Sequence, residues 1–225
     1  MTVLFVVATI IVFLVIDAIY RRLHQPINQP ITTAVVHHAA PRTPEGIFFA
    51  RSHTWLNLLP SGRVHLGIDD LVSGMLEKPN VVFLGNPGES IRKGDPILAI
   101  REGDRRLTIA SPLDGKIVSV NDELSQHPDA WKSSSFSNGW VYNVQPNRLS
   151  DVKQFLLGAE SRTWMQTELS RLRDFLMEVM EVNGHVSLAG TVLQDGGLPS
   201  SGLMSSFDDQ TLERFQREFL SVTER

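Results

Sequence analysis

The segment "REGDRRLTIASPLDGKIVSVN", which spans Arg101–Asn121, decides how the middle of this chain folds. It reads as two short strands around a tight Gly103-Asp104 turn, followed by a second turn and another run of alternating residues. Glycine permits the positive φ that a tight hairpin turn requires. The segment therefore predicts a β-hairpin with Asp104 at its tip, flanked by Arg105 and Arg106.

The same pattern continues on both sides of this hairpin, from Phe48 to Val144. Short runs of alternating apolar and polar residues, separated by turn residues, are typical of an all-β domain. The candidate strands are "TWLNLLP", "RVHLGI", "PNVVFLG", "PILAIRE", "RLTIASP", "GKIVSVN" and "GWVYNVQP". One short helix is expected within "IDDLVSGML", where apolar residues recur at helical spacing.

Amphipathic segments follow the strands. Apolar residues gather on one face of Leu149–Leu157 and of Arg162–Val182, and charged residues lie on the other face. After "LQDGGLPSSG", Asp208 or Asp209 is positioned to cap one more helix, whose shared apolar face consists of Leu212, Phe215 and Phe219. These helices either pack on their own domain or bind a partner.

The composition suits a folded, globular chain. Of 225 residues, 42% are hydrophobic and 20% are charged, which excludes wholesale disorder. The net charge of -4 provides no basic excess for phosphates, so no nucleic-acid partner is expected. The absence of cysteine excludes disulfides, thiolate metal sites and thiol catalysis. The pair His37-His38 has no third ligand nearby, so no metal site is expected.

The first residues predict a membrane anchor. Thr2–Tyr20 is almost entirely apolar, and its length matches a helix that crosses ~30 Å of hydrocarbon. A cleaved signal peptide is the alternative, but it would begin with basic residues, whereas Arg21 and Arg22 follow the apolar run. Positive charge on this side predicts a single-pass protein with a cytoplasmic globular domain. Residues 1–22 are the predicted anchor and residues 23–46 a proline-rich linker.

Five signatures, in order and at near-constant spacing, resemble the H protein of the glycine cleavage system. They are "SHTW" (Ser52–Trp55), "LGIDDLVSGML" (Leu66–Leu76), "NVVFLGNPGESIRKGDPI" (Asn80–Ile97), "SPLDGKIVSVNDEL" (Ser111–Leu124) and "HPDAWKSSSFSNGWVYNVQP" (His127–Pro146). The resemblance implies a mainly β fold with helices (α+β), a flattened β-sandwich of the biotinyl/lipoyl-carrier type, or barrel-sandwich hybrid. We assign residues 47–160 to this domain and residues 161–225 to a C-terminal helical extension.

The resemblance also implies a lipoyl-bearing lysine at the hairpin tip, eight residues before the proline of the family's Ala-Pro-x-x-Gly motif. Here that proline is Pro112, and the residue eight positions earlier is Asp104. Lipoyl attachment forms an amide, which requires an amine, and a carboxylate has none. Arg105 and Arg106 remain cations and are poor acyl acceptors. We therefore expect no lipoyl group at this tip and no bound cofactor.

Two functions remain open. The first is a membrane-anchored, non-lipoylated module that acts as an accessory or docking subunit of a membrane-associated complex, with an unidentified protein partner. Its candidate interaction residues are Glu102, Asp104, Arg105 and Arg106, unless these simply form a solvated turn. The alternative is a lipoyl carrier of glycine cleavage or a related lipoate-dependent pathway, which would need attachment elsewhere, such as at Lys93.

Enzyme motifs are not evident in this sequence. It contains no G-x-S-x-G elbow, no glycine-rich phosphate loop and no H-E-x-x-H motif. The pair Asp69-Asp70 is predicted to cap a helix rather than to act as an acid–base pair, because adjacent side chains point apart. His53 matches the family's His-x-Trp position and is predicted to be structural. We therefore expect no catalytic residue.

Overall fold

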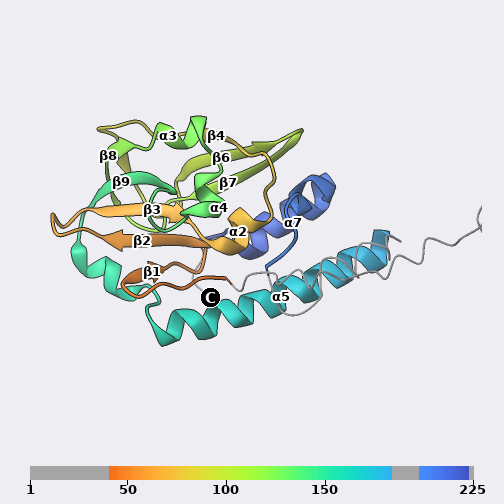
Figure 1. Ribbon diagram of the computed structural model, residues 1–225. Coiled ribbons are helices and arrows are strands. Elements are labelled where there is room, and N and C mark those ends of the chain that lie inside the picture. Colours follow the sequence, from red (N-terminus) through yellow and green to blue (C-terminus); the bar gives the residue numbers. More distant parts are fainter. Residues whose placement is uncertain (1–40, 184–197, 223–225) are drawn as a thin grey trace, which may run out of the picture. The chain divides into compact units, whose positions relative to one another are not determined.

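The computed structural model describes residues 41–183 and 198–222 (Figure 1). The predicted anchor, most of the linker and the pair His37-His38 lie outside the described residues. Within the two described ranges, no helix combines the length and the hydropathy that crossing a bilayer requires.

Two antiparallel sheets form the β domain. The six-stranded sheet has the order β1-β2-β3-β9-β8-β5, with bounds β1 (Ile47–Phe49), β2 (Thr54–Leu58), β3 (Val64–Ile68), β9 (Trp140–Pro146), β8 (Gly115–Val120) and β5 (Ser90–Ile91). The three-stranded sheet has the order β4-β6-β7, with bounds β4 (Asn80–Phe83), β6 (Pro96–Glu102) and β7 (Arg105–Ala110). The fold class predicted for the β domain is confirmed.

The core lies between the two sheets because alternate strand residues point inward. In β7, Leu107 and Ile109 are buried while their neighbours are more exposed. Tyr142 of β9 is fully buried, and its hydroxyl donates a 2.6 Å hydrogen bond to the carbonyl of Ile97 in β6. This bond satisfies a buried polar group and joins the two sheets.

The predicted strands and short helix are present, and some elements were not anticipated. Helix α2 (Asp70–Gly74) is capped by Asp69, whose Oδ1 accepts hydrogen bonds from two backbone amides of the first turn. Strands β1 and β5 were not predicted, nor were the short helices α3 (Glu123–Gln126) and α4 (Ala130–Ser133). The helix expected at Leu149–Leu157 is a 3₁₀ turn, η1 (Leu149–Gln154).

The C-terminal helices pack on the β domain and on each other. They are α5 (Ala159–Asn183), the 3₁₀ turn η2 (Leu203–Ser206) and α7 (Asp209–Phe219). The rings of Trp164 in α5 and Phe49 in β1 lie 6.4 Å apart, and Phe175 in α5 lies 5.6 Å from Phe219 in α7. Figure 1 shows α5 running past β1 and α7 beside the β6–β7 hairpin. Both apolar stripes therefore pack within the protein.

Candidate functional site: the hairpin tip and helix α7

The β6–β7 hairpin ends in a two-residue turn. Glu102 pairs with Arg105, and Gly103 and Asp104 connect the two strands. Gly103 has a φ of 58°, a left-handed conformation that glycine adopts without a Cβ clash. Asp104 is exposed at the end of the turn, as the sequence predicts.

Glu102 turns toward the protein rather than toward solvent. Glu102 is only 6% exposed, and its Oε1 accepts hydrogen bonds of 2.8 Å from the backbone amides of both Glu77 and Lys78. These amides belong to the loop that follows α2. The carboxylate therefore holds this loop against the tip end of the hairpin, and it does not share the exposed position of Asp104.

Helix α7 is fastened along β7 by two polar contacts. Arg105 forms an ion pair with Asp209, the first residue of α7, where a negative charge also suits the helix dipole. Two helical turns later, Gln216 accepts a 3.0 Å hydrogen bond through Oε1 from the backbone amide of Thr108. The structure thus brings the predicted tip residue Arg105 together with the C-terminal extension, which the sequence did not predict.

A groove of about 700 Å³ lies between β7 and α7. Its lining includes alternate residues of β7, namely Arg106, Thr108 and Ala110. The α7 side contributes, among others, residues spaced by about one helical turn, namely Leu212, Gln216 and Leu220. Arg106, the fourth of the predicted interaction residues, therefore faces this groove.

A second polar site lies inside the protein, around His53. This residue is fully buried and has a φ of 59°, and its Nδ1 lies 2.7 Å from Asp69 Oδ2. Its Nε2 lies 3.5 Å from Glu168 Oε2, an ion-pair distance that is long for a hydrogen bond. Burial by itself lowers the pKa of His53, but the two carboxylates outweigh it and raise that pKa to about 9.

Glu168 extends this site to the C-terminal helices. Burial raises its pKa, but hydrogen bonding and charge from His53, together with Arg171, produce a net lowering. Arg171 Nη1 lies 2.5 Å from Glu168 Oε2, and Arg171 Nη2 donates to the backbone carbonyl of Glu218 in α7 at 2.8 Å. The guanidinium also stacks over the ring of Phe219, 4.4 Å from its centroid. A series of charged contacts thus joins the β1–β2 turn, the N-cap of α2, α5 and α7.

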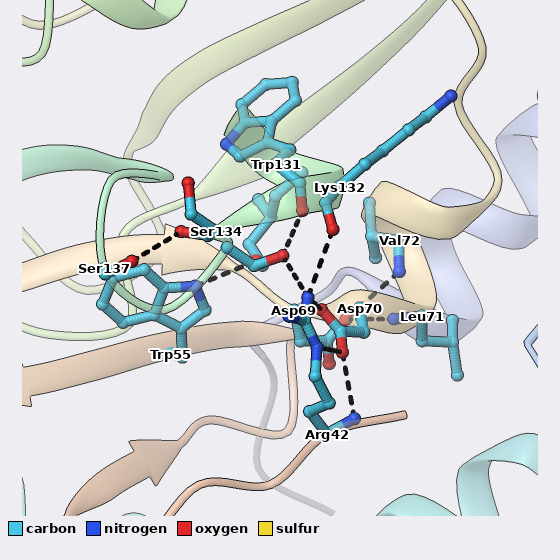
Figure 2. Close-up of polar contacts among 12 residues, drawn as sticks. Arg42, Trp55, Asp69, Asp70, Leu71, Val72, Trp131, Lys132, Ser134 and Ser137 are labelled. Atoms are coloured by element: carbon cyan, nitrogen blue, oxygen red, sulfur yellow. Dashed lines mark hydrogen bonds and ion pairs between the residues drawn. The ribbon is translucent and has the colours of Figure 1, made fainter. Parts of the chain in front are cut away.

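The two adjacent aspartates contact different partners, as predicted from the sequence. While Asp69 faces His53, Asp70 accepts hydrogen bonds from the backbone amide of Arg42 at 2.9 Å and from its Nε at 2.7 Å. Figure 2 shows this Arg42–Asp70 pair beside the cap of α2. Arg42 Nη2 also donates to Ser135 Oγ at 2.9 Å, which links the start of the described chain to the segment after α4.

Each of these polar sites fixes its charged side chains through ion pairs and hydrogen bonds. Both nitrogens of His53 face carboxylates. Across residues 41–183 and 198–222, no group of three His, Cys, Asp or Glu side chains is placed to hold a metal ion. Sequence reasoning did not find Arg42 or Gln216. It placed Glu168 on the water-facing side of its helix, and this is wrong, because Glu168 is only 7% exposed and faces His53. The Glu168–Arg171 spacing of three residues carried a local signal for their ion pair.

Comparison with known proteins identifies the β domain. The family model described as "Glycine cleavage H-protein" matches residues 47–168. A glycine cleavage system H protein from Stenotrophomonas maltophilia is 29% identical over 50% of this chain and 86% of its own length. One from Hydrogenovibrio crunogenus is 30% identical over 50% of this chain and 88% of its own length.

A crystal structure of a glycine cleavage system H protein from Mycobacterium marinum aligns with 52% of this chain and 94% of its own, at 25% identity and a TM-score of 0.43. Residues 47–168, which the family model matches, include the hairpin, the His53, Asp69 and Glu168 side chains and the first part of α5, but neither Arg171 nor α7. Because the family model matches more than half of the 225 residues and the relatives align over most of their own lengths, this chain belongs to the glycine cleavage H-protein family.

Proposed function

We propose that this protein is an H-protein-type component of the glycine cleavage system or of a related lipoate-dependent pathway. The observation that supports this role is the family match across residues 47–168, which covers the whole β domain. The relatives named above are themselves glycine cleavage system H proteins, matched over 86% and 88% of their lengths. This favours a role of the carrier class over an unrelated accessory role.

As a carrier, the protein would need an accessible amine for the lipoyl group. Lys93 is exposed in the turn between β5 and β6, beside Gly94, whose φ is 92°. Lys116 is also exposed but lies within β8, paired with Ser90 on one side and Gln145 on the other. A lysine in an exposed turn can enter the active site of an attaching enzyme more readily than one inside a sheet. Lys93 is therefore the better candidate.

A second candidate is a docking member of the family that carries no lipoyl group. The observation that favours it is the tip itself, where Asp104 supplies a carboxylate at the position that family spacing assigns to the lysine. The neighbouring Arg105 is engaged by Asp209, so the hairpin is tethered rather than free to swing. Such a protein would contact the family's partners through its retained β domain without passing a group between them.

Mass spectrometry of the full chain separates these two candidates. The protein is expressed with lipoate and the lipoyl-attaching enzymes of a host whose own H protein is modified in the same cells. A carrier gains the mass of lipoic acid less one water, and Lys93→Arg abolishes the gain while Lys116→Arg does not. An unmodified chain supports the docking candidate. If the unmodified chain also fails to bind any protein of the glycine cleavage system, the pathway assignment is wrong.

We also propose that the apolar run Thr2–Tyr20 anchors the protein in a membrane with the β domain on the cytoplasmic side. The length of the run and the two arginines after it support this proposal. Carbonate extraction of membranes tests the anchoring. If the run is an anchor, the full chain stays in the membrane pellet. Protease digestion of sealed inside-out vesicles measures the orientation, and a β domain that survives would contradict it.

A further inference from the structure

Two arginines face each other across the strands of the β6–β7 hairpin. Arg101 of β6 and Arg106 of β7 are directly opposed in the antiparallel register, so their side chains lie on the same face of the sheet. The amide of Thr108, two residues further along β7, points away from β6 to Gln216. The Arg101–Arg106 pair is therefore of the type without hydrogen bonds between the two residues, in which opposed side chains lie closest.

This pair of like charges has no acidic partner among the described residues. Both arginines are exposed, and neither forms an ion pair with a carboxylate within residues 41–183 and 198–222. The neighbouring Arg105, by contrast, is paired with Asp209. Directly opposed like charges destabilise a sheet. An anion bound between the two guanidinium groups would remove this repulsion.

Further hydrogen-bond donors lie on either side of the pair. Asn80 of β4 is exposed and opposes Arg101 in the register, so it lies on the same face. On the other side, Arg106 lines the groove of about 700 Å³ together with Arg217 of α7. Arg217 is also exposed and forms no ion pair within the described ranges. Three guanidinium groups and one carboxamide thus lie along one stretch of surface.

Positive charge predominates on this surface. Glu213 is the acidic residue among the described residues that line the groove, and Asp104 is exposed at the hairpin tip, so the three arginines outnumber the nearby carboxylates. Lys93 also lines the groove but already has an interaction of its own, so the available positive charge comes from the arginines. The planar guanidinium fork binds phosphate oxygens through paired, charge-assisted hydrogen bonds.

The groove also has an apolar lining beside these charges. Leu212 and Leu220 of α7 line it together with Ala110 of β7. A ligand would fit beside α7 without displacing the helix, because the groove is already present. Its volume lies within the range of natural ligand pockets, which combine apolar walls with a few polar groups that fix orientation. The lining suits a small molecule with a charged end and an apolar body.

The geometry points to a phosphate site: a small organic phosphate binds with its phosphate group between Arg101, Arg106 and Arg217 and with its apolar body in the groove beside α7. This goes beyond the proposed pathway role and does not depend on whether the chain carries lipoate. A free small molecule is favoured over a lipid headgroup because the groove itself provides the apolar surface. Since α7 lies outside the family match, the site would be a property of this chain.

Isothermal titration calorimetry on the full chain in nonionic detergent tests the proposal. The probes are phenyl phosphate, inorganic phosphate and benzyl alcohol. Phenyl phosphate should bind saturably with one site per chain and about tenfold more tightly than inorganic phosphate, because its ring is buried against the apolar lining. Benzyl alcohol has the ring without the charge and should not bind measurably.

Variants of the arginines test the charged end of the site. Arg106→Gln and Arg217→Gln should each weaken the binding of both phosphates roughly tenfold. Arg63→Gln, at an exposed position on the β2–β3 turn, is the matched control and should change neither. Arg101→Gln should weaken binding and also raise the midpoint of thermal unfolding without phosphate, because it removes the repulsion between the opposed arginines.

A variant of the lining tests the apolar end. Ala110→Leu adds bulk to the groove and should weaken phenyl phosphate to about the affinity of inorganic phosphate. The binding of inorganic phosphate should stay unchanged, which also shows that this variant is folded. If Ala110→Leu retains the full preference for phenyl phosphate, the apolar body does not lie in the groove and the proposal is wrong.

Three further results would overturn the proposal. One is the lack of saturable binding of either phosphate to the wild type. Another is an equal loss of affinity in Arg63→Gln and Arg106→Gln, which would leave only general charge attraction. The third is binding of the protein to vesicles that contain phosphatidate, lost in Arg106→Gln, when free phenyl phosphate does not bind. In that case the arginines contact a lipid surface instead.

Discussion

His53 Nε2 lies 3.5 Å from Glu168 Oε2, and this contact joins the turn between β1 and β2 to helix α5. The imidazole is completely buried, with Asp69 on its other nitrogen and the ring of Trp164 at 5.1 Å. A buried cation between two carboxylates is stable only while both pairings persist. The C-terminal helices are therefore coupled electrostatically to the β domain.

The stability of the protein should depend on pH through His53. Its folded pKa of about 9 lies above the ordinary value of 6.5, so its stabilisation is complete below about pH 6.5 and is lost as the pH rises through 9. Asparagine tolerates the positive φ, so His53→Asn serves as the reference variant. Relative to it, the wild type should lose about 3 kcal/mol of unfolding free energy as the pH rises from about 6.5 to about 9. Urea unfolding at several pH values measures this difference, and a flat difference would contradict it.

Glu168→Gln provides the matched test of the same site. The amide keeps the shape of the side chain but removes one of the two negative charges that face His53. The pH window in which stability falls should then move to lower pH, because the pKa of His53 decreases. Glu160→Gln, at an exposed position in the first turn of α5, should leave the window unchanged. A shift of equal size in both variants would show that the effect is nonspecific.

Removing Arg42 should destabilise the protein through Asp70. The Asp70 side chain is only 4% exposed and loses its charged partner in Arg42→Ala, while the Arg42 side chain is 46% exposed, so water can replace part of the interaction. We expect a loss of about 2 kcal/mol in the free energy of unfolding. Arg63→Ala is the control and should change it by less than about 0.5 kcal/mol. An equal loss of unfolding free energy in both variants would show that Asp70 does not require the charge of Arg42.

Gly67 should not accept even a methyl group. A Cβ at this position in β3 would overlap the indole of Trp55, which is fully buried and donates a 2.9 Å hydrogen bond from Nε1 to the carbonyl of Ile68. Gly67→Ala should therefore lower the free energy of unfolding by about 2–3 kcal/mol. In Gly74→Ala the nearest atom is Leu198 Cβ at 3.8 Å, so this helical control should be neutral or stabilising. Thermal unfolding of both variants measures the contrast.

Placing a lysine at the tip should create a lipoyl attachment position. Asp104→Lys supplies the missing amine on an exposed two-residue turn whose backbone is already formed. Co-expressed with lipoyl-attaching enzymes, it should gain lipoate at residue 104, which peptide mass mapping detects. Asp104→Arg has the same charge but no amine that can be acylated, and should stay unmodified. If Asp104→Lys also stays unmodified while a host H protein is lipoylated, the tip differs from that of the family in shape as well as in residue.

Local patterns predicted much of the fold. The alternation in "RLTIASP" and "GKIVSVN" marks β7 and β8 because each strand buries one face, and Asp69 was assignable as a cap because a capping carboxylate acts on amides two and three residues away. Strands β1 and β5 were missed since runs of three and two residues carry no readable period. β5 pairs with the distant strand β8, and Phe49 of β1 also bridges to the distant residue Leu156.

The order of residues along the chain was sufficient to determine the β domain, its family and the carboxylate at the hairpin tip, because these depend on periodicity, turn chemistry and motif spacing between near neighbours. Only the tertiary structure decided that Arg105 meets Asp209, that Glu168 faces His53 and that α7 runs along β7. The partners in these contacts are separated by roughly half the chain in each case, and side-chain charge alone does not specify which of many possible partners folding brings within reach.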